Sequence, residues 1–181
     1  MTLPKAPSQP QIPLVVMQSN PSVDSKLSTK TLNYLHTVGL PISEELGFSF
    51  TGQVLLLPNQ VVRFVEAPGI LFVDMEKPPE GRKVCLDLSQ GELIRWEDDP
   101  QNGFINSSAE QFTQSVQAFE YYLEHIQAKE VFGTFYDNTG ATKNRAAYAN
   151  ALADKLRAID PAVFEKGYYW PAFVEEIENG L

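Results

Sequence analysis

The sequence predicts an α+β fold in which an antiparallel or mixed sheet is packed by helices. Three observations predict it: a helical pattern near the N-terminus, short apolar runs in the middle third, and helical spacing in the last third. The gaps between the apolar runs are short, whereas a parallel crossover needs about a dozen residues, so antiparallel pairing is favoured. A chain of 181 residues has room for one well-buried core, which predicts a single domain.

Residues 1–24 are predicted to form an extended arm that precedes a single domain over residues 25–181. Prolines stand at positions 4, 7, 10, 13 and 21, and such spacing suits neither a helix nor the apolar stretch of a secretory signal. The domain then begins with a helix that Ser28 or Thr29 can cap and that Gly39 can end. Leu32, Leu35 and Val38 share one face of this helix.

The strand-like runs of the middle third are rich in Val, Ile, Leu and Phe and are separated by turn-forming residues. They cover residues 53–58, 61–69, 69–75, 82–91 and 91–98. In the fourth run, Val84, Leu86 and Leu88 alternate with Cys85 and Asp87, which predicts a buried and an exposed face. The third run, GILFVDM, is apolar on both sides and predicts a central strand covered by helices.

The stretch FINSSAEQF predicts the joint between the sheet and a long helix. Ser107 at the N-cap with Glu110 three positions later is the capping-box pattern. Behind this joint, an apolar stripe with spacings of 4, 3, 4 and 3 comprises Phe112, Val116, Phe119, Leu123 and Ile126. The helix is therefore expected to lie on the sheet.

The last third predicts two more helices. The first carries Tyr148, Leu152, Leu156 and Ile159 on one face, and residues 138–143 before it are predicted to form a capping turn. Asp160-Pro161 then gives a cap followed by proline at the first helical position. The final helix aligns Trp170, Phe173, Val174 and Ile177.

The charge of the chain favours a basic partner. The net charge is −9, and residues 61–120 carry five basic and eleven acidic side chains, which is 5 − 11 = −6 of that total. An acidic protein repels phosphate backbones, so we expect no direct nucleic-acid binding, whereas a basic protein would be attracted. The alternative remains open that acidity only keeps the protein soluble.

The segment that would span a membrane, about 18 apolar residues, is absent from the sequence. A single cysteine, Cys85, excludes an internal disulfide framework and is typical of a reducing compartment. We therefore expect a cytoplasmic protein without a membrane partner.

The residues that usually carry catalysis form no recognisable site. His36 and His125 each lie in the last turn of a predicted helix, where a structural role is sufficient explanation. The acidic residues of the middle third lack any metal-binding spacing such as H-E-x-x-H, C-x-x-C or D-x-D-x-D-G. We therefore expect no cofactor, no metal and no catalytic residue, which favours a binding module over an enzyme.

Several short motifs occur together in a recognisable order. They are Gly39-Leu40-Pro41, Val84-Cys85-Leu86-Asp87 with Gly91, Asn106-Ser107-Ser108 with Phe112, Asp160-Pro161, and Trp170. In this order, over residues 28–179, the sequence resembles the SUKH superfamily, specifically its fourth group, whose members are mostly immunity proteins of bacterial polymorphic toxin systems. Ala109 departs from the leucine that usually follows the N-S-S motif, and the proline-spaced arm has no counterpart in the family pattern.

The resemblance implies a SUKH-like domain that neutralises a cognate toxin by binding it. Such toxins are often nucleases or nucleic-acid deaminases with a basic substrate-binding face, which agrees with the acidic charge here. The motif residues are interpreted as structural. The predicted contact surface consists of Glu66, Asp74, Glu76, Trp96, Glu97, Asp98 and Asp99.

Two alternative functions are retained. The first is an intracellular scaffold or regulator built on the same fold. The second is a metal-dependent hydrolase that would use the acidic cluster Glu97, Asp98 and Asp99.

Overall fold

The computed structural model describes residues 12–57, 60–66, 83–96, 103–132 and 138–179. Its strands are β1 (Leu14–Val15), β2 (Leu40–Pro41), β3 (Phe50–Leu57), β4 (Val61–Glu66), β5 (Lys83–Asp87), β6 (Leu93–Trp96) and β7 (Gly103–Asn106). Its helices are α1 (Pro21–Asp24), α2 (Thr29–Thr37), α3 (Ala109–Phe132), α4 (Asn138–Ile159), a 3₁₀ helix (Pro161–Phe164) and α5 (Tyr169–Asn179). This is the predicted order of helix, strands and then helices.

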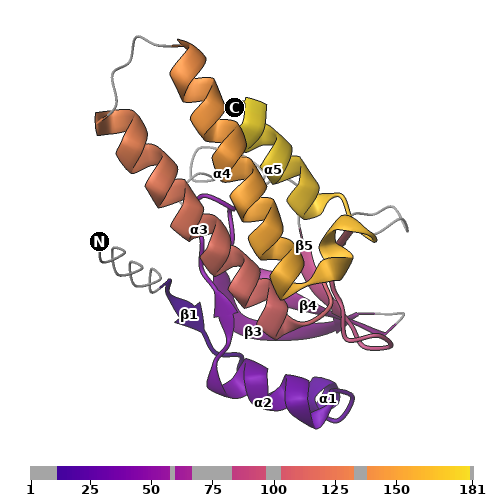
Figure 1. Cartoon of the computed structure of the whole chain (residues 1–181). Helices are drawn as coiled ribbons and strands as arrows, with labels where there is room; N and C mark the ends of the chain where they lie inside the picture. Colours follow the sequence, from indigo (N-terminus) through magenta and orange to yellow (C-terminus); the bar gives the residue numbers. More distant parts are fainter. Residues whose placement is uncertain (1–11, 58–59, 67–82, 97–102, 133–137, 180–181) are drawn as a thin grey trace, which may run out of the picture.

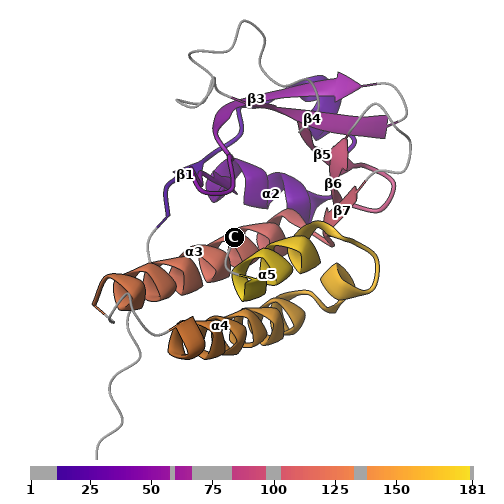
Figure 2. The same cartoon turned by 90° about the horizontal axis from the view of Figure 1, so that it is seen from above.

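The main sheet has five strands in the order β3-β4-β5-β6-β7, and every neighbouring pair is antiparallel. A second, two-stranded sheet pairs β1 with β2. Helices α3, α4 and α5 lie together on one side of the main sheet (Figure 1, Figure 2). The predicted α+β fold with an antiparallel sheet packed by helices is therefore confirmed.

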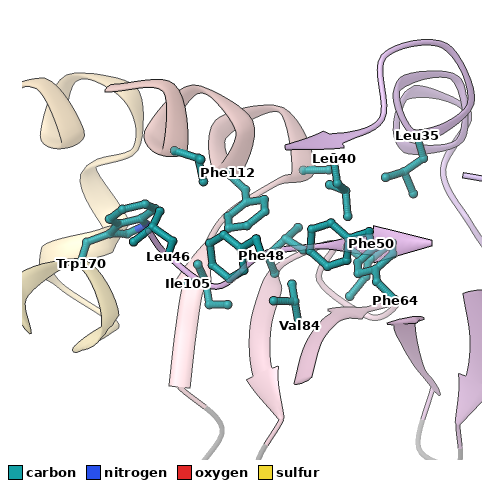
Figure 3. Close-up of a cluster of buried hydrophobic side chains, with 14 of the residues drawn as sticks. Leu35, Leu40, Leu46, Phe48, Phe50, Phe64, Val84, Ile105, Phe112 and Trp170 are labelled. Atoms are coloured by element: carbon teal, nitrogen blue, oxygen red, sulfur yellow. The ribbon is translucent and has the colours of Figure 1, made fainter. Parts of the chain in front are cut away.

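The core fills the space between this sheet face and the helices (Figure 3). Phe112 and Val116 of α3 are fully buried, as the predicted stripe requires. The Phe48 ring meets that of Phe112 edge-on at 5.1 Å, and Phe50 meets Phe64 edge-on at 6.1 Å. Aromatic rings in this geometry add to the stabilisation that burial already provides. The predicted stripe residue Ile126 lies outside the described side chains.

The second face of the sheet carries a small buried apolar cluster, which corrects the prediction for β5. Cys85 was expected on an exposed face but is 0% exposed, and it packs with Val61 and Ile94 in a smaller cluster. Val84 and Leu86 face the helices as predicted. Alternation therefore separates two faces here, but both of them are buried at this position. The predicted strand GILFVDM, residues 69–75, lies outside the described residues.

The start of α3 differs by one residue from the predicted capping box. The Gln111 N–H donates to the Ser108 hydroxyl at 3.2 Å, and the Ser108 hydroxyl donates to the Gln111 side chain at 2.8 Å. Ser108 with Gln111 is thus the capping pair, in a Ser-x-x-Gln form instead of the predicted Ser-x-x-Glu form. Ser107 donates to the Asp160 carboxylate instead. Glu110 forms an ion pair with Lys30 at 3.0 Å.

Three other local predictions meet different outcomes. The helix cap at Ser28 is confirmed, because its hydroxyl accepts from the Thr31 N–H at 3.1 Å. Residues 138–143 belong to helix α4 and form no turn, so that prediction is wrong. His125 lies inside α3, which continues to Phe132, so it does not occupy a last turn.

Residues 12–24, predicted as part of an extended arm, pack onto the domain. Met17 and Val23 are buried in the main core, and Pro21–Asp24 forms helix α1. The Asn20 side chain caps α1 by accepting from the Ser22 N–H at 3.2 Å. This stretch is therefore built into the fold as far as it is described.

Candidate interaction surface

A buried polar joint fixes the position of α3 against the helices that follow it. The Asp160 carboxylate is 1% exposed and accepts from the Ser107 N–H at 2.7 Å, the Ser107 hydroxyl at 2.9 Å and the Asn106 amide at 3.1 Å. The Asn106 amide also donates to the Ser115 hydroxyl at 3.2 Å, and its oxygen accepts from the Trp170 indole N–H at 2.9 Å. The three bonds to the Asp160 carboxylate are charge-assisted, and such bonds are roughly twice as strong as neutral ones.

The joint connects elements that are far apart in sequence. Asp160 follows α4 and caps the 3₁₀ helix by accepting from the Ala162 N–H at 3.3 Å, which confirms the predicted cap. The Gln111 side chain of α3 donates to the carbonyl of Ile159, the last residue of α4, at 3.1 Å. The orientation of α3 relative to the sheet is therefore set at its N-terminal end.

A tight turn, residues 43–48, precedes β3 and contacts α3. Ser43 and Phe48 exchange two backbone hydrogen bonds, at 2.9 Å and 2.7 Å, and Gly47 takes a positive φ of 70° between them. Leu46 and Phe48 point into the core. This anchoring leaves the neighbouring Glu44 and Glu45 exposed to solvent.

The turn places these two carboxylates beside α3. The Ser43 hydroxyl accepts from the Leu46 N–H at 3.1 Å and donates to the carboxylate of Glu120, which is half-buried in the middle of α3. We call Glu44, Glu45, Glu120 and Glu124 the Glu120 cluster. Its members come from two segments that are 77 positions apart at the Ser43–Glu120 contact.

The pKa of Glu120 reflects both its burial and its charged neighbours. Burial is the largest cause that raises its pKa above the ordinary value. The hydrogen bond from Ser43 acts in the opposite direction and lowers the pKa. The carboxylates of Glu45, Glu124 and Glu44 raise the pKa as well, because each repels the ionised form. The cluster thus gathers four carboxyl groups from one helix and one turn.

The structure places only part of the predicted contact surface. Glu66 ends β4 opposite Phe50, and Trp96 ends β6 with its backbone opposite Lys83. The Trp96 side chain and five carboxylates lie outside the described residues; these carboxylates are Asp74, Glu76, Glu97, Asp98 and Asp99. Residues 67–82 run between Glu66 and Lys83, and residues 97–102 run between Trp96 and Gly103.

The strand ends that flank these two segments lie together. The register pairs Arg63 with Cys85 and Arg95 with Gly103, so the end of β4, the start of β5, the end of β6 and the start of β7 share one end of the sheet. β3 begins at the same end, because Phe50 is opposite Glu66. The turn with Glu44 and Glu45 leads directly into β3, so the Glu120 cluster lies toward this end as well.

Sequence reasoning missed the Glu120 cluster, although one signal for it was present. Glu120 and Glu124 are four positions apart on a helix, where like charges destabilise each other. A like-charge pair at this spacing next to a buried face is a reason to look for a functional role. The partners Glu44 and Glu45 could not be assigned to it from spacing, because only the tertiary fold brings the turn to α3.

Metal chemistry and membrane insertion find no support in the described residues. Within these ranges, no three His, Cys, Asp or Glu side chains lie close enough together to hold a metal ion. Nor does any helix in the described part of the chain have the length and apolar character needed to cross a membrane.

Comparison with known proteins identifies a family for this chain. A family model described as SUKH-4 immunity protein matches residues 20–176, which includes every secondary-structure element from α1 to most of α5. No curated protein and no solved structure matches the chain. The motifs that carry the sequence resemblance lie within this range, after the end of α2, in β5 and in the buried joint at Asp160. The chain belongs to the SUKH-4 immunity protein family.

Proposed function

We propose that this protein is an immunity protein that binds a cognate bacterial toxin and neutralises it by stoichiometric association in the cytoplasm. The observation that carries the proposal is membership of the SUKH-4 immunity protein family over residues 20–176. The described residues supply a rigid scaffold with an acidic surface, which suits inhibition by occupation of a partner. In this proposal the protein transforms no substrate.

The toxin that best fits the charge is a basic nuclease or nucleic-acid deaminase. A protein that binds nucleic acid meets phosphates with Lys and Arg, so its substrate face is positive. This chain has a net charge of −9 and would be steered toward such a face, which raises the association rate more than it changes the strength of each contact. The same charge disfavours binding of this chain to the nucleic acid itself.

The described part of the proposed contact surface lies toward the end of the sheet where β3 begins and β4 and β6 end. It combines the Glu120 cluster with the predicted residues Glu66, Asp74, Glu76, Trp96, Glu97, Asp98 and Asp99. Rigid elements carry the Glu120 cluster, since α3 is fixed by the buried joint and the turn by its paired backbone bonds. A preorganised acidic surface loses little conformational freedom when a partner binds.

Co-expression tests this function. Genes that neighbour this one are expressed singly in a sensitive host, with and without this chain, and growth is measured. We expect one neighbouring gene to arrest growth and this chain to restore it, whereas an unrelated toxin should remain lethal. If no neighbouring product is toxic, or if this chain never restores growth, the immunity proposal is wrong.

The stoichiometry of inhibition distinguishes a protein that blocks the toxin by binding from one that modifies the toxin catalytically. Purified toxin is titrated with this chain while nuclease or deaminase activity is followed. Inhibition should be complete near equimolar amounts, and light scattering should show a complex of the two chains. Protection by a small fraction of an equivalent would indicate that this chain modifies the toxin catalytically. Binding without loss of toxin activity would favour the scaffold alternative.

A further inference from the structure

Residues 13–20, which we call the N-terminal strap, run between β2 and the edge strand β3. On the β2 side, β1 pairs with Leu40 and Pro41, and the Ile42 N–H donates to the Pro13 carbonyl at 2.9 Å. On the α2 side, the Met17 N–H donates to the Leu35 carbonyl at 2.9 Å. The strap is thus held at several points along its length, and Figure 1 shows β1 at the β3 side of the molecule.

The strap also occupies the free edge of β3. The Gln18 N–H donates to the Gly52 carbonyl at 2.7 Å, and the Asn20 side chain donates to the Val54 carbonyl at 3.2 Å. Both carbonyls therefore point away from β4, on the side where β3 has no partner among the described strands of the main sheet. Because outward-pointing residues alternate along a strand, Leu56 is the next residue whose backbone points to this side.

Two glycines allow the strap to approach so closely. At Gly39, with φ of 88°, an added Cβ would lie 2.1 Å from the Val15 carbonyl oxygen. At Gly52, with φ of 83°, it would lie 2.8 Å from the Val16 carbonyl oxygen. Both clashes are with backbone atoms, which cannot move aside as a flexible side chain can. The absence of a side chain at Gly39, just before β2, and at Gly52, within β3, therefore lets the strap backbone lie close to both strands.

The covered edge has the composition of a strand that would pair with others. β3 reads FTGQVLLL and contains no charged residue and no proline, which are the usual means of preventing edge pairing. Leu55 and Leu56 at its end are 48% and 37% exposed. Natural proteins that do not blunt such an edge by sequence commonly cover it with another segment. The strap is the described segment that hydrogen-bonds to this edge.

We propose that the strap is an intramolecular cover of the β3 edge and that its release lets β3 pair with β3 of a second copy of this chain. A second copy fits because antiparallel pairing of one strand with itself is two-fold symmetric, and an uncharged strand meets no like-charge repulsion in doing so. The strap lies almost wholly before residue 20, where the family match begins. This inference is independent of toxin binding.

Glycine variants with matched controls test the close contacts of Gly39 and Gly52 with the strap. Gly39→Ala and Gly52→Ala should each displace the strap. The controls Gly47→Ala and Gly91→Ala share the positive φ, at 70° and 75°, but nothing lies within 4 Å of the added Cβ. All four variants carry the same left-handed backbone penalty, so a difference between the pairs reports the contact with the strap.

The readouts are hydrogen exchange and mass in solution. In Gly52→Ala, exchange of the Gln18 amide should accelerate by at least about tenfold, because it loses its acceptor. Light scattering should show a dimer that grows with protein concentration. The two control variants should remain monomeric with wild-type exchange at Gln18. A monomeric Gly52→Ala variant whose strap has lost its protection would overturn the proposal, and so would unchanged protection.

A second pair of variants keeps the test valid if the glycine variants fail to fold. Gln18→Pro removes the N–H that binds Gly52 and leaves the buried Met17 in place, whereas Gln18→Ala keeps that N–H. The proline variant should dimerise and the alanine variant should not. Adding Leu56→Lys to the proline variant should restore the monomer, since a lysine on the edge opposes strand pairing. A dimer that persists with Leu56→Lys, or a monomeric Gln18→Pro variant, refutes β3 pairing.

Discussion

Ser107 donates both its backbone N–H and its hydroxyl to the carboxylate of Asp160, although 53 positions separate the two residues. The bonds are 2.7 Å and 2.9 Å long and lie in the core between β7, α3 and the 3₁₀ helix. Each residue belongs to a short local motif, N-S-S and D-P, that looks like an independent helix cap. These two bonds make the two motifs one structural unit.

Replacing Asp160 with Asn should destabilise the protein by about 2–4 kcal/mol, because buried donors that lose their acceptor cost about 1–3 kcal/mol each. The amide of the variant would turn an N–H₂ group toward the donors of Ser107 or Asn106. Urea unfolding measures the loss. The control Asp154→Asn concerns an exposed partner of Arg157 and should change stability by less than about 0.5 kcal/mol. Equal effects of the two substitutions would argue against the joint.

Trp170→Phe tests the same joint from α5. Phenylalanine keeps most of the buried ring but removes the indole N–H that donates to the Asn106 oxygen at 2.9 Å. We expect a loss of about 1–3 kcal/mol, because the amide oxygen remains buried without this donor. Thermal unfolding followed by circular dichroism measures it. When Asp160→Asn and Trp170→Phe are combined, the losses should not be additive, since both act on Asn106. Additive losses would mean that the two bonds are independent.

Glu120 predicts a specific pH dependence. Burial and the neighbouring carboxylates raise its pKa in the folded state, so between the ordinary glutamate pKa and the raised value the folded protein binds more protons than the unfolded chain. The contribution of Glu120 to stability is therefore present at low pH and is lost as the pH rises through that window. Glu120→Gln, which can still accept from Ser43, should become more stable relative to wild type as the pH rises above the ordinary glutamate pKa of 4.5.

The same comparison at high salt serves as its control. Salt screens the repulsion from Glu44, Glu45 and Glu124 but leaves the burial of Glu120 unchanged. The advantage of Glu120→Gln at neutral pH should therefore shrink in 1 M salt without disappearing. A difference between variant and wild type that is constant over the pH range would contradict the raised pKa.

Charge reversal tests the proposed contact surface. Glu44→Lys with Glu45→Lys should slow association with a basic toxin by at least about tenfold at low ionic strength and flatten its salt dependence. The matched control is Glu175→Lys with Glu176→Lys on exposed positions of α5, which changes the net charge by the same amount. Stopped-flow kinetics distinguishes the two pairs. An equal slowing would mean that only the total charge matters, and the Glu120 cluster would then no longer be assigned to the contact surface.

The same association kinetics tests three of the contact residues predicted from the sequence. Reversal of Glu97, Asp98 and Asp99 together should slow association with the toxin, because these carboxylates are proposed to belong to the contact surface. Dissociation rates should change less than association rates if their contribution is long-range. Unchanged association kinetics would remove these three residues from the surface and leave the Glu120 cluster to be judged by its own variants.

Much of the fold could be predicted because its signals are local. The α3 and α4 stripes follow from side chains three and four positions apart, and the Ser28 cap from the need of a first turn for a hydrogen-bond acceptor. The antiparallel sheet followed from short connections. The errors arose where one local pattern allowed two solutions, as when Ser107 and Ser108 could both cap α3 and only Ser108 remained free to do so.

The candidate surface was less predictable than the fold. Acidity in the middle third favoured a basic partner, and Glu66 and Trp96 lie at the same end of the sheet, but their role in binding stays a prediction. The Glu120 cluster depends on a turn and a helix that are adjacent only after the sheet has formed. Cys85 shows the same limit, since alternation cannot reveal that the second face of a strand is also covered.

The amino-acid sequence by itself determined the order of helix, strands and helices in the domain, a first cap at Ser28 or Thr29, the cap at Asp160, and the family whose motifs the chain resembles. These properties depend on spacing along the chain and on groups within one helical turn of each other. Only the tertiary structure decided that Ser107 meets Asp160, that Ser43 meets Glu120, and that the N-terminal strap lies along β3. Such contacts between distant positions form only when the buried surfaces of the whole chain pack together, so no local pattern specifies them.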